Sequence, residues 1–229
     1  MKKTIILFTT LFIFSISNLF AAPGFFSLGY VITLAGSLPE YKIEKNGGSL
    51  NKSDYQTQSY FEGGIILQTA YNFIVSSRTQ SAITLGVDFG YHRDAFSFID
   101  YNIKKKYANL FDSILVGGYL ESTIYGFMLG VGGGVKIALG GNYRYDNIIE
   151  LLNYSRLKDR FDDLYIPYIK VVVGYKFYKN YSSSSLSFYF NYDFPNVKVK
   201  GVAPDVQKLA AIDLGVQITG HFNFIEDYY

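Results

Sequence analysis

Large hydrophobic side chains alternate with small or polar ones along most of the sequence. Within residues 126–139, Phe127 and Leu129 fall on one face of an extended chain, while Gly130 and Lys136 fall on the other. A period of two places successive side chains on opposite faces of a β-strand. The same pattern predicts eight strands, at about residues 25–36, 59–74, 81–92, 110–121, 126–139, 164–178, 185–194 and 208–224.

The predicted strands are longer than those of most soluble proteins. Each covers about 10–16 residues, whereas strands in soluble proteins usually have about 5–6. A tilted strand needs about 9–11 residues to cross the hydrocarbon core of a membrane. The strand lengths therefore favour a protein that crosses a membrane with β-strands.

The connections between these strands alternate between long and short, and the first is long. The long ones include residues 37–58, 93–109 and 140–163, and the short ones lie near residues 76–80, 122–125 and 180–184. Outer-membrane β-barrels have short periplasmic turns and longer loops outside. The order predicts an up-and-down barrel with both chain ends on the periplasmic side.

One face of each strand holds bulky apolar residues, and the other holds Gly, Ser, Thr and isolated charges. The interior of an eight-stranded barrel is just wide enough for its side chains, so the bulky face must point outward, where only lipid tolerates it. We therefore predict an all-β fold, a closed antiparallel up-and-down transmembrane β-barrel of eight strands. Ten strands remain open if residues 37–58 or 140–163 contain a hairpin. A secreted sandwich or lipocalin-like barrel is the soluble alternative.

The first 21 residues have the pattern of an export signal. Lys2 and Lys3 precede an apolar run, and small residues end the segment at Ala21. The run is shorter than the ~20 residues that a membrane-spanning helix needs. We predict a signal peptide at 1–21 and the barrel domain at 22–229, with cleavage after Ser17 or Ala22 left open.

Composition narrows the range of functions. The sequence has 22 Tyr, 20 Phe and 22 Gly but no Cys, which excludes disulfides and thiolate metal sites. Without Lys2 and Lys3, the 21 basic residues become 19 and equal the 19 acidic ones. A neutral mature chain argues against binding to nucleic acid.

Several charged residues fall on the face that would line the barrel interior. A charge in a narrow lumen is costly unless it is paired. We therefore predict a polar network of salt bridges in the lumen, formed by Glu62, Asp88, Lys136, Lys170 and Asp213. The network would lock the lumen, gate small solutes or ions, or border a cavity for a lipid or substrate.

The last strand ends on Gly220, Phe222 and Phe224. With the strand and loop pattern, this ending resembles the small bacterial outer-membrane β-barrel proteins, the class of OmpA-like and OmpX-like transmembrane barrels. The resemblance implies that these three residues act as the insertion signal read by the barrel-assembly machinery, and that outer-membrane lipids surround the barrel. The residues from Ile225 to Tyr229 extend beyond that pattern.

Catalytic signals are weak. Of the two histidines, His221 stands in a His-Phe-Asn stretch, which lacks the serine of the His-x-Ser pair found in lipid-deacylating barrels. His92 with Asp94 is a single His–Asp couple, while barrel proteases need further acids. The Gly-rich stretch at 130–134 lacks the setting of a nucleotide loop. We predict no catalytic residues, no metal and no cofactor, and a short amphipathic helix within 146–157.

The resulting hypothesis is a non-enzymatic outer-membrane barrel that anchors surface loops. Residues 37–58, 93–109 and 140–163 would contact a surface ligand. A narrow channel or transporter for small or hydrophobic solutes is the first alternative, and a lipid-modifying barrel enzyme is the second.

Overall fold

The computed structural model describes residues 24–44, 50–51, 55–100, 104–146, 148–179, 181–200 and 206–224. The predicted signal peptide at 1–21 lies outside this part of the chain. No helix in the described ranges is long and apolar enough to span a membrane.

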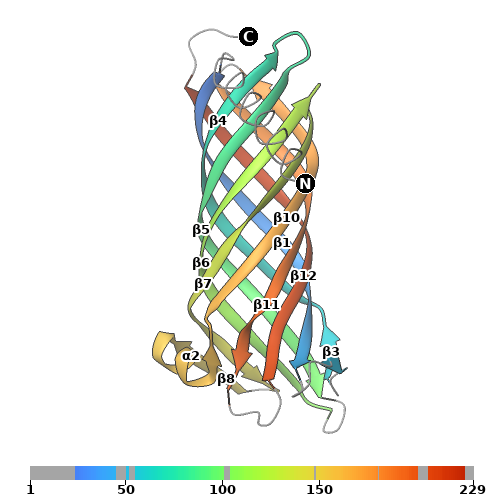
Figure 1. Ribbon diagram of the computed structural model, residues 1–229, viewed down its shortest axis with the longest axis vertical. Helices are drawn as coiled ribbons and strands as arrows, with labels where there is room; N and C mark the ends of the chain where they lie inside the picture. The colour runs from blue at the N-terminus through green and yellow to red at the C-terminus, as the bar shows by residue number, and fades with distance from the viewer. Residues whose placement is uncertain are drawn as a thin grey trace, which may run out of the picture.

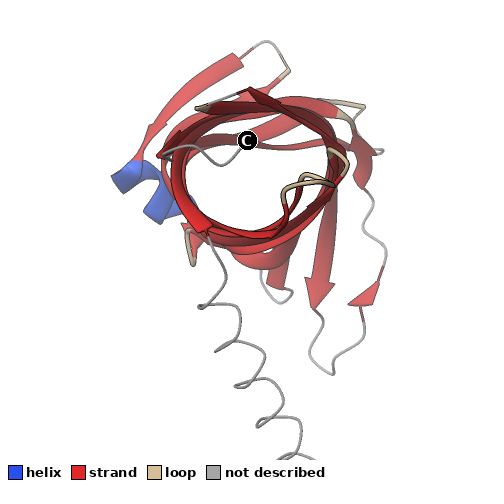
Figure 2. Cartoon of the chain, turned by 90° about the horizontal axis from the view of Figure 1, so that it is seen from above, coloured by secondary structure: helices blue, strands red, loops and turns tan. Residues whose placement is uncertain are grey.

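Eight long antiparallel strands form a closed ring, which confirms the predicted barrel (Figures 1 and 2). They are β1 (Gly24–Glu44), β4 (Tyr60–Ser76), β5 (Ser81–Asp100), β6 (Lys106–Ile124), β7 (Phe127–Tyr145), β10 (Tyr165–Lys179), β11 (Ser182–Val199) and β12 (Val206–Phe224). Each pairs with its neighbour along the chain, and β1 pairs with β12 to close the ring, with Phe26 opposite Phe224.

Five short elements stand at the loop-side end of the barrel, which is the lower end in Figure 1. They are β2 (Leu50–Asn51), β3 (Tyr55–Gln58), β8 (Ile148–Asn153), α2 (Tyr154–Arg160) and β9 (Phe161–Asp162). β8 pairs with the end of β7, and β9 pairs with the end of β11. The region 140–163 therefore contains additional strands, but they extend the rim and do not enter the ring.

The strands reach farther toward the loop side than the sequence pattern predicts. β1 continues to Glu44, β5 to Asp100 and β7 to Tyr145. The ranges 37–58, 93–109 and 140–163, which we predicted as loops, consist largely of strand, so those boundaries were wrong. Backbone pairing continues there because ladder hydrogen bonds do not depend on an apolar outer face.

The turns at the other end are short, as predicted. Tyr125 and Gly126 connect β6 to β7, and both have a positive φ, of 53° and 81°. Positive φ at both central residues is the mark of a type I′ hairpin turn, whose twist matches that of the flanking strands. Gly tolerates this conformation without steric cost.

The two faces of the barrel wall have the predicted orientation. Leu129 and Phe188 point outward and are 50% and 74% exposed. Asp88 and Lys136 point into the lumen and are each 1% exposed. Along these parts of the strands the barrel is therefore apolar outside and polar within, the reverse of a soluble barrel.

Candidate functional site

The outer surface of the barrel is covered with large apolar side chains. Exposed Leu, Ile, Val, Phe and Tyr residues occur on each of the eight ring strands. A continuous surface of this kind belongs in lipid, and closure of the ring leaves no unpaired sheet edge there. A closed antiparallel barrel with an apolar outer band and a polar interior is the architecture of bacterial outer-membrane proteins. The chain is an outer-membrane β-barrel protein on that ground.

Lys136 lies at the centre of the lumen and binds two carboxylates. Its Nζ atom is 2.5 Å from Oδ1 of Asp94 and 2.9 Å from a carboxylate oxygen of Asp193. Lys136 projects from β7, Asp94 from β5 and Asp193 from β11. The ammonium group therefore ties together strands on both sides of its own.

Asp94 is held by two more side chains. Nδ1 of His92 lies 2.9 Å from its Oδ1 atom, and the hydroxyl of Ser113 donates to its Oδ2 atom at 2.8 Å. Asp94 is fully buried, so these contacts replace the water that a carboxylate loses on burial. They fix the carboxylate on which Lys136 sits.

Asn191 extends the network to a third acid. Its side-chain amide donates to Oδ1 of Asp193 at 2.9 Å and to Oδ2 of Asp213 at 2.6 Å. Asp213 thereby joins β12 to the network of side chains that links β5, β7 and β11.

Two further ion pairs cross the lumen closer to the short-turn end. Lys170 binds Asp88 at 3.4 Å, and the amide of Gln68 donates to Asp88 at 2.6 Å. Lys176 binds Glu121 at 2.7 Å. The members of each pair stand on strands that are not adjacent in the ring, so each pair bridges the lumen rather than one ladder.

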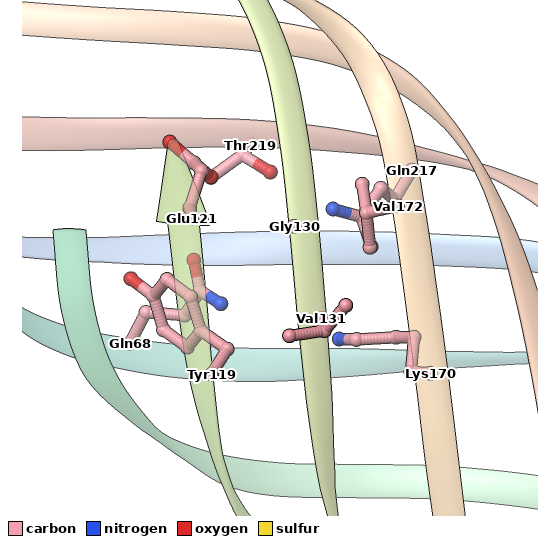
Figure 3. A pocket seen from close by; sticks show the side chains of 9 residues that line it. All are labelled: Gln68, Tyr119, Glu121, Gly130, Val131, Lys170, Val172, Gln217 and Thr219. Carbon is pink, nitrogen blue, oxygen red and sulfur yellow. The ribbon is translucent and has the colours of Figure 1, made fainter. Parts of the chain in front are cut away.

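A small cavity lies among these pairs (Figure 3). Its volume is about 20 Å³, the space of about one water molecule. Its walls come from β4, β6, β7, β10 and β12 and include Gln68, Tyr119, Glu121, Lys170 and Gln217. The polar lining suits a hydrogen-bonded water molecule. The cavity is too small for a larger solute.

An apolar cluster fills the interior on the loop side of Lys136 and its two carboxylate partners. The ring of Phe111 packs against Phe96, with centroids 5.5 Å apart, and edge-on against Phe161 at 5.2 Å. Leu157 of α2 and Ile166 of β10 belong to the same buried cluster. Several of its residues, such as Phe96 and Leu157, lie in ranges that the sequence pattern predicts as loops. The cluster was therefore not predicted.

The predicted lumen residues are brought together only in part. All five are buried, and Lys170 pairs with Asp88. Lys136 pairs with other acids, and Asp213 contacts Asn191. Both carboxylate oxygens of Glu62 are buried without a hydrogen-bond partner in the described part of the chain. The expected salt bridge at Glu62 was therefore wrong, because inward orientation alone does not fix which residues meet.

Two acids of the central layer were missed as members of the network. Asp193 was on the predicted inner face of its strand but was not assigned a partner. Asp94 stands two residues after His92 and six after Asp88, so the period-two pattern carried to residue 94 would have placed it inside. The predicted strand ends at residue 92, whereas β5 continues to Asp100 and includes Asp94.

The two histidines lie at different levels of the barrel. His92 is opposite Gly64 and contacts the central layer, while His221 is opposite Ser183, beside a short turn. Among the described residues, no three His, Asp or Glu side chains are arranged to hold a metal ion.

The segment formed by β8 and α2, residues 148–160, projects sideways from the loop-side rim (Figures 1 and 2) and is called the β8–α2 hairpin below. Asn153 caps the helix by accepting the backbone N–H of Arg156 at 3.0 Å, and Leu157 anchors it in the apolar cluster. Ile149 and Leu151 on the strand are 59% and 72% exposed. The helix predicted within 146–157 was largely wrong, because Ile148–Asn153 form β8 and the helix α2 covers Tyr154–Arg160, so the two share only residues 154–157.

Solved structures with a similar barrel are outer-membrane proteins. OprG from Pseudomonas aeruginosa has 11% identity over 90% of this chain and 97% of its own, with a TM-score of 0.41. AlkL, solved in lipid bilayers, has 14% identity over 88% of this chain and 92% of its own, with a TM-score of 0.35. The outer membrane protease OmpT from Escherichia coli has 10% identity over 86% and 97%, with a TM-score of 0.38.

No model of a known protein family matches the chain, and no curated protein matches it. The identities and TM-scores of the similar structures are low, so the membrane placement rests on the surface of this barrel itself.

Proposed function

We propose that this outer-membrane barrel is a non-conducting, non-enzymatic anchor that presents its loop-side rim to partners outside the cell. The observation that carries the proposal is the filled lumen. Four ion pairs, made by Lys136, Lys170 and Lys176, cross the lumen, and an apolar cluster occupies its loop-side end. A solute crossing the barrel would have to break buried charge pairs, which is costly.

The contact surface of this anchor is the β8–α2 hairpin. It is fixed at its base by Leu157 and by an ion pair of 2.5 Å between Arg160 and Glu150. It carries exposed Ile149 and Leu151 outside the barrel wall. Exposed apolar residues on a rigid, projecting element are typical of a protein-interaction surface. This narrows the predicted contact region 140–163 to the hairpin.

Planar-bilayer recording tests the non-conducting part of the proposal. The purified wild-type barrel should insert and produce no stable conductance steps, because buried ion pairs and the apolar cluster lie across the lumen. Steady single-channel steps from wild-type protein would favour the channel alternative and overturn the proposal.

Adhesion assays test the hairpin. Bacteria producing the double variant Ile149→Asp and Leu151→Asp are compared with bacteria producing wild-type protein for self-aggregation and for adhesion to cultured cells. In bacteria with the double variant, self-aggregation, adhesion or both should fall to the level of bacteria without the protein, while the barrel stays folded. Unchanged behaviour in both assays would remove the hairpin as the contact surface.

A further inference from the structure

The lipid-facing surface has a gap near the β10–β11 turn. Across four neighbouring strands, one outward row reads Phe177, Ser184, Gly220 and Tyr30. Phe177 and Tyr30 are large and exposed, whereas the two positions between them carry a hydroxymethyl group and a hydrogen. The ring of Tyr30 lies over Gly220, where an added Cβ would meet it at 2.9 Å. The row therefore forms a notch whose open floor is at Ser184, between Phe177 and Tyr30.

The adjacent row, one step closer to the turn, carries a charge. It reads Lys179, Ser182, Phe222 and Leu28. Phe222 continues the aromatic wall, and Lys179 is exposed beside two serines that face the notch. Lys179 forms no ion pair with another described residue. One end of the notch is thus cationic and hydroxyl-rich, and the other is apolar.

The notch is an open groove of ligand size. Its volume is about 350 Å³, within the range of about 300–1,000 Å³ typical of small-molecule sites. The groove lies at the short-turn end, which faces the periplasm in outer-membrane barrels. Lys179 therefore stands at the depth of the lipid headgroups, and Tyr30 and Phe177 stand at the edge of the acyl region.

We infer that this notch is a binding site for one phospholipid of the periplasmic leaflet. The groove is continuous with the lipid-facing surface, so its occupant comes from the surrounding bilayer. The Lys179 ammonium group donates to the lipid phosphate, and an acyl chain lies over Ser184 between Phe177 and the Tyr30 ring that covers Gly220. Elsewhere on β11 the outward positions are Leu186, Phe188 and Phe190, which leave no such gap.

The hydroxyl groups of the notch complete the match to a phospholipid. Ser182 already donates its hydroxyl to the backbone carbonyl of Lys179 at 3.1 Å, so its oxygen lone pairs remain available as acceptors. Ser184 has an exposed hydroxyl that can donate to an ester carbonyl of the lipid. The inference depends on the membrane-facing surface and is independent of the loop-side role proposed above.

Native mass spectrometry of the purified barrel, titrated with phosphatidylglycerol in detergent, tests the site. Wild-type protein should form one saturable lipid adduct. Ser184→Leu fills the notch with a side chain that the lipid-facing surface accepts elsewhere, and it should abolish that adduct. Lys179→Gln should weaken lipid binding about fivefold, as expected for one lysine near a lipid phosphate.

Two matched variants serve as controls. Ser122→Leu changes another outward serine, which is flanked by Ile83 and Leu129 and has no notch. Lys198→Gln removes an exposed lysine on the loop side. Both should bind phosphatidylglycerol like wild type. The inference is overturned if Ser184→Leu or Lys179→Gln binds like wild type, or if a control loses binding to the same extent.

Discussion

At the scale of single residues, Lys136 has the largest share in holding the lumen closed. It is buried to 99% of its surface and contacts Asp94 and Asp193, which stand 42 and 57 residues away in the sequence. Buried pairs of this kind contribute little net stability compared with apolar residues, but removing one partner leaves an uncompensated charge. Lys136 is therefore more important for keeping the network paired than for the strength of any one bond.

Replacing Lys136 with Met should lower the free energy of unfolding by about 3–5 kcal/mol, because Asp94 and Asp193 would remain buried without their cation. Urea unfolding in lipid vesicles, followed by gel migration, measures the change. The triple variant that also carries Asp94→Asn and Asp193→Asn should recover most of the loss. Equal stability of wild type and the single variant would show that Lys136 is not a required partner.

Among the elements, the two halves of each ring strand lie in different surroundings. The short-turn halves face lipid and follow the period-two pattern, while the loop-side halves of β5, β6 and β7 build the apolar cluster with α2. Leu157 is the helix residue that connects the hairpin to this cluster and is fully buried. The position of α2, which has only seven residues, therefore depends on Leu157, whereas β8 is held by its ladder with β7 and by buried Leu152.

Leu157→Ala should release α2 from the rim at a cost of about 2–5 kcal/mol in local stability, as is typical for removing a buried leucine. Limited proteolysis of the folded protein should then cut within residues 148–162 faster than in wild type. Arg156→Ala, which changes an exposed residue of the same helix, provides the control. Identical cleavage rates in all three proteins would contradict the anchoring role.

At the scale of the whole molecule, the reversed distribution of apolar and polar residues is the property that determines where the protein can fold. An exposed band of large apolar residues requires lipid, and a lumen filled with ion pairs requires a closed ring. The folded barrel should migrate differently on a gel before and after boiling. Migration that is the same in both states, with the protein in the soluble fraction, would be incompatible with this architecture.

An arginine in the lipid-facing band should impair insertion. Leu67 lies outward on β4 and is surrounded by other apolar residues. Leu67→Arg should reduce the folding free energy in vesicles by about 2–4 kcal/mol, the cost of a charge near the bilayer midplane. Leu151→Arg makes the same change on the hairpin outside the ring and should leave folding unchanged.

The alternation along the chain was enough to predict the eight ring strands, their up-and-down order and the outward direction of residues such as Leu129 and Phe188. These properties follow from a local pattern, because a period of two and the choice of turn residues are set within a few positions. The notch at Ser184 was not predicted, because its walls, Phe177 and Tyr30, come together only through pairing across four strands.

Three features became known from the folded barrel alone: the pairing of Lys136 with Asp94 and Asp193, the lack of a hydrogen-bond partner for Glu62 among the described residues, and the apolar cluster that joins Phe111 to α2. Contacts across a lumen depend on the register and tilt of strands that are far apart in the chain. Sequence alternation states which side chains point inward, but the geometry of ring closure determines which of them meet.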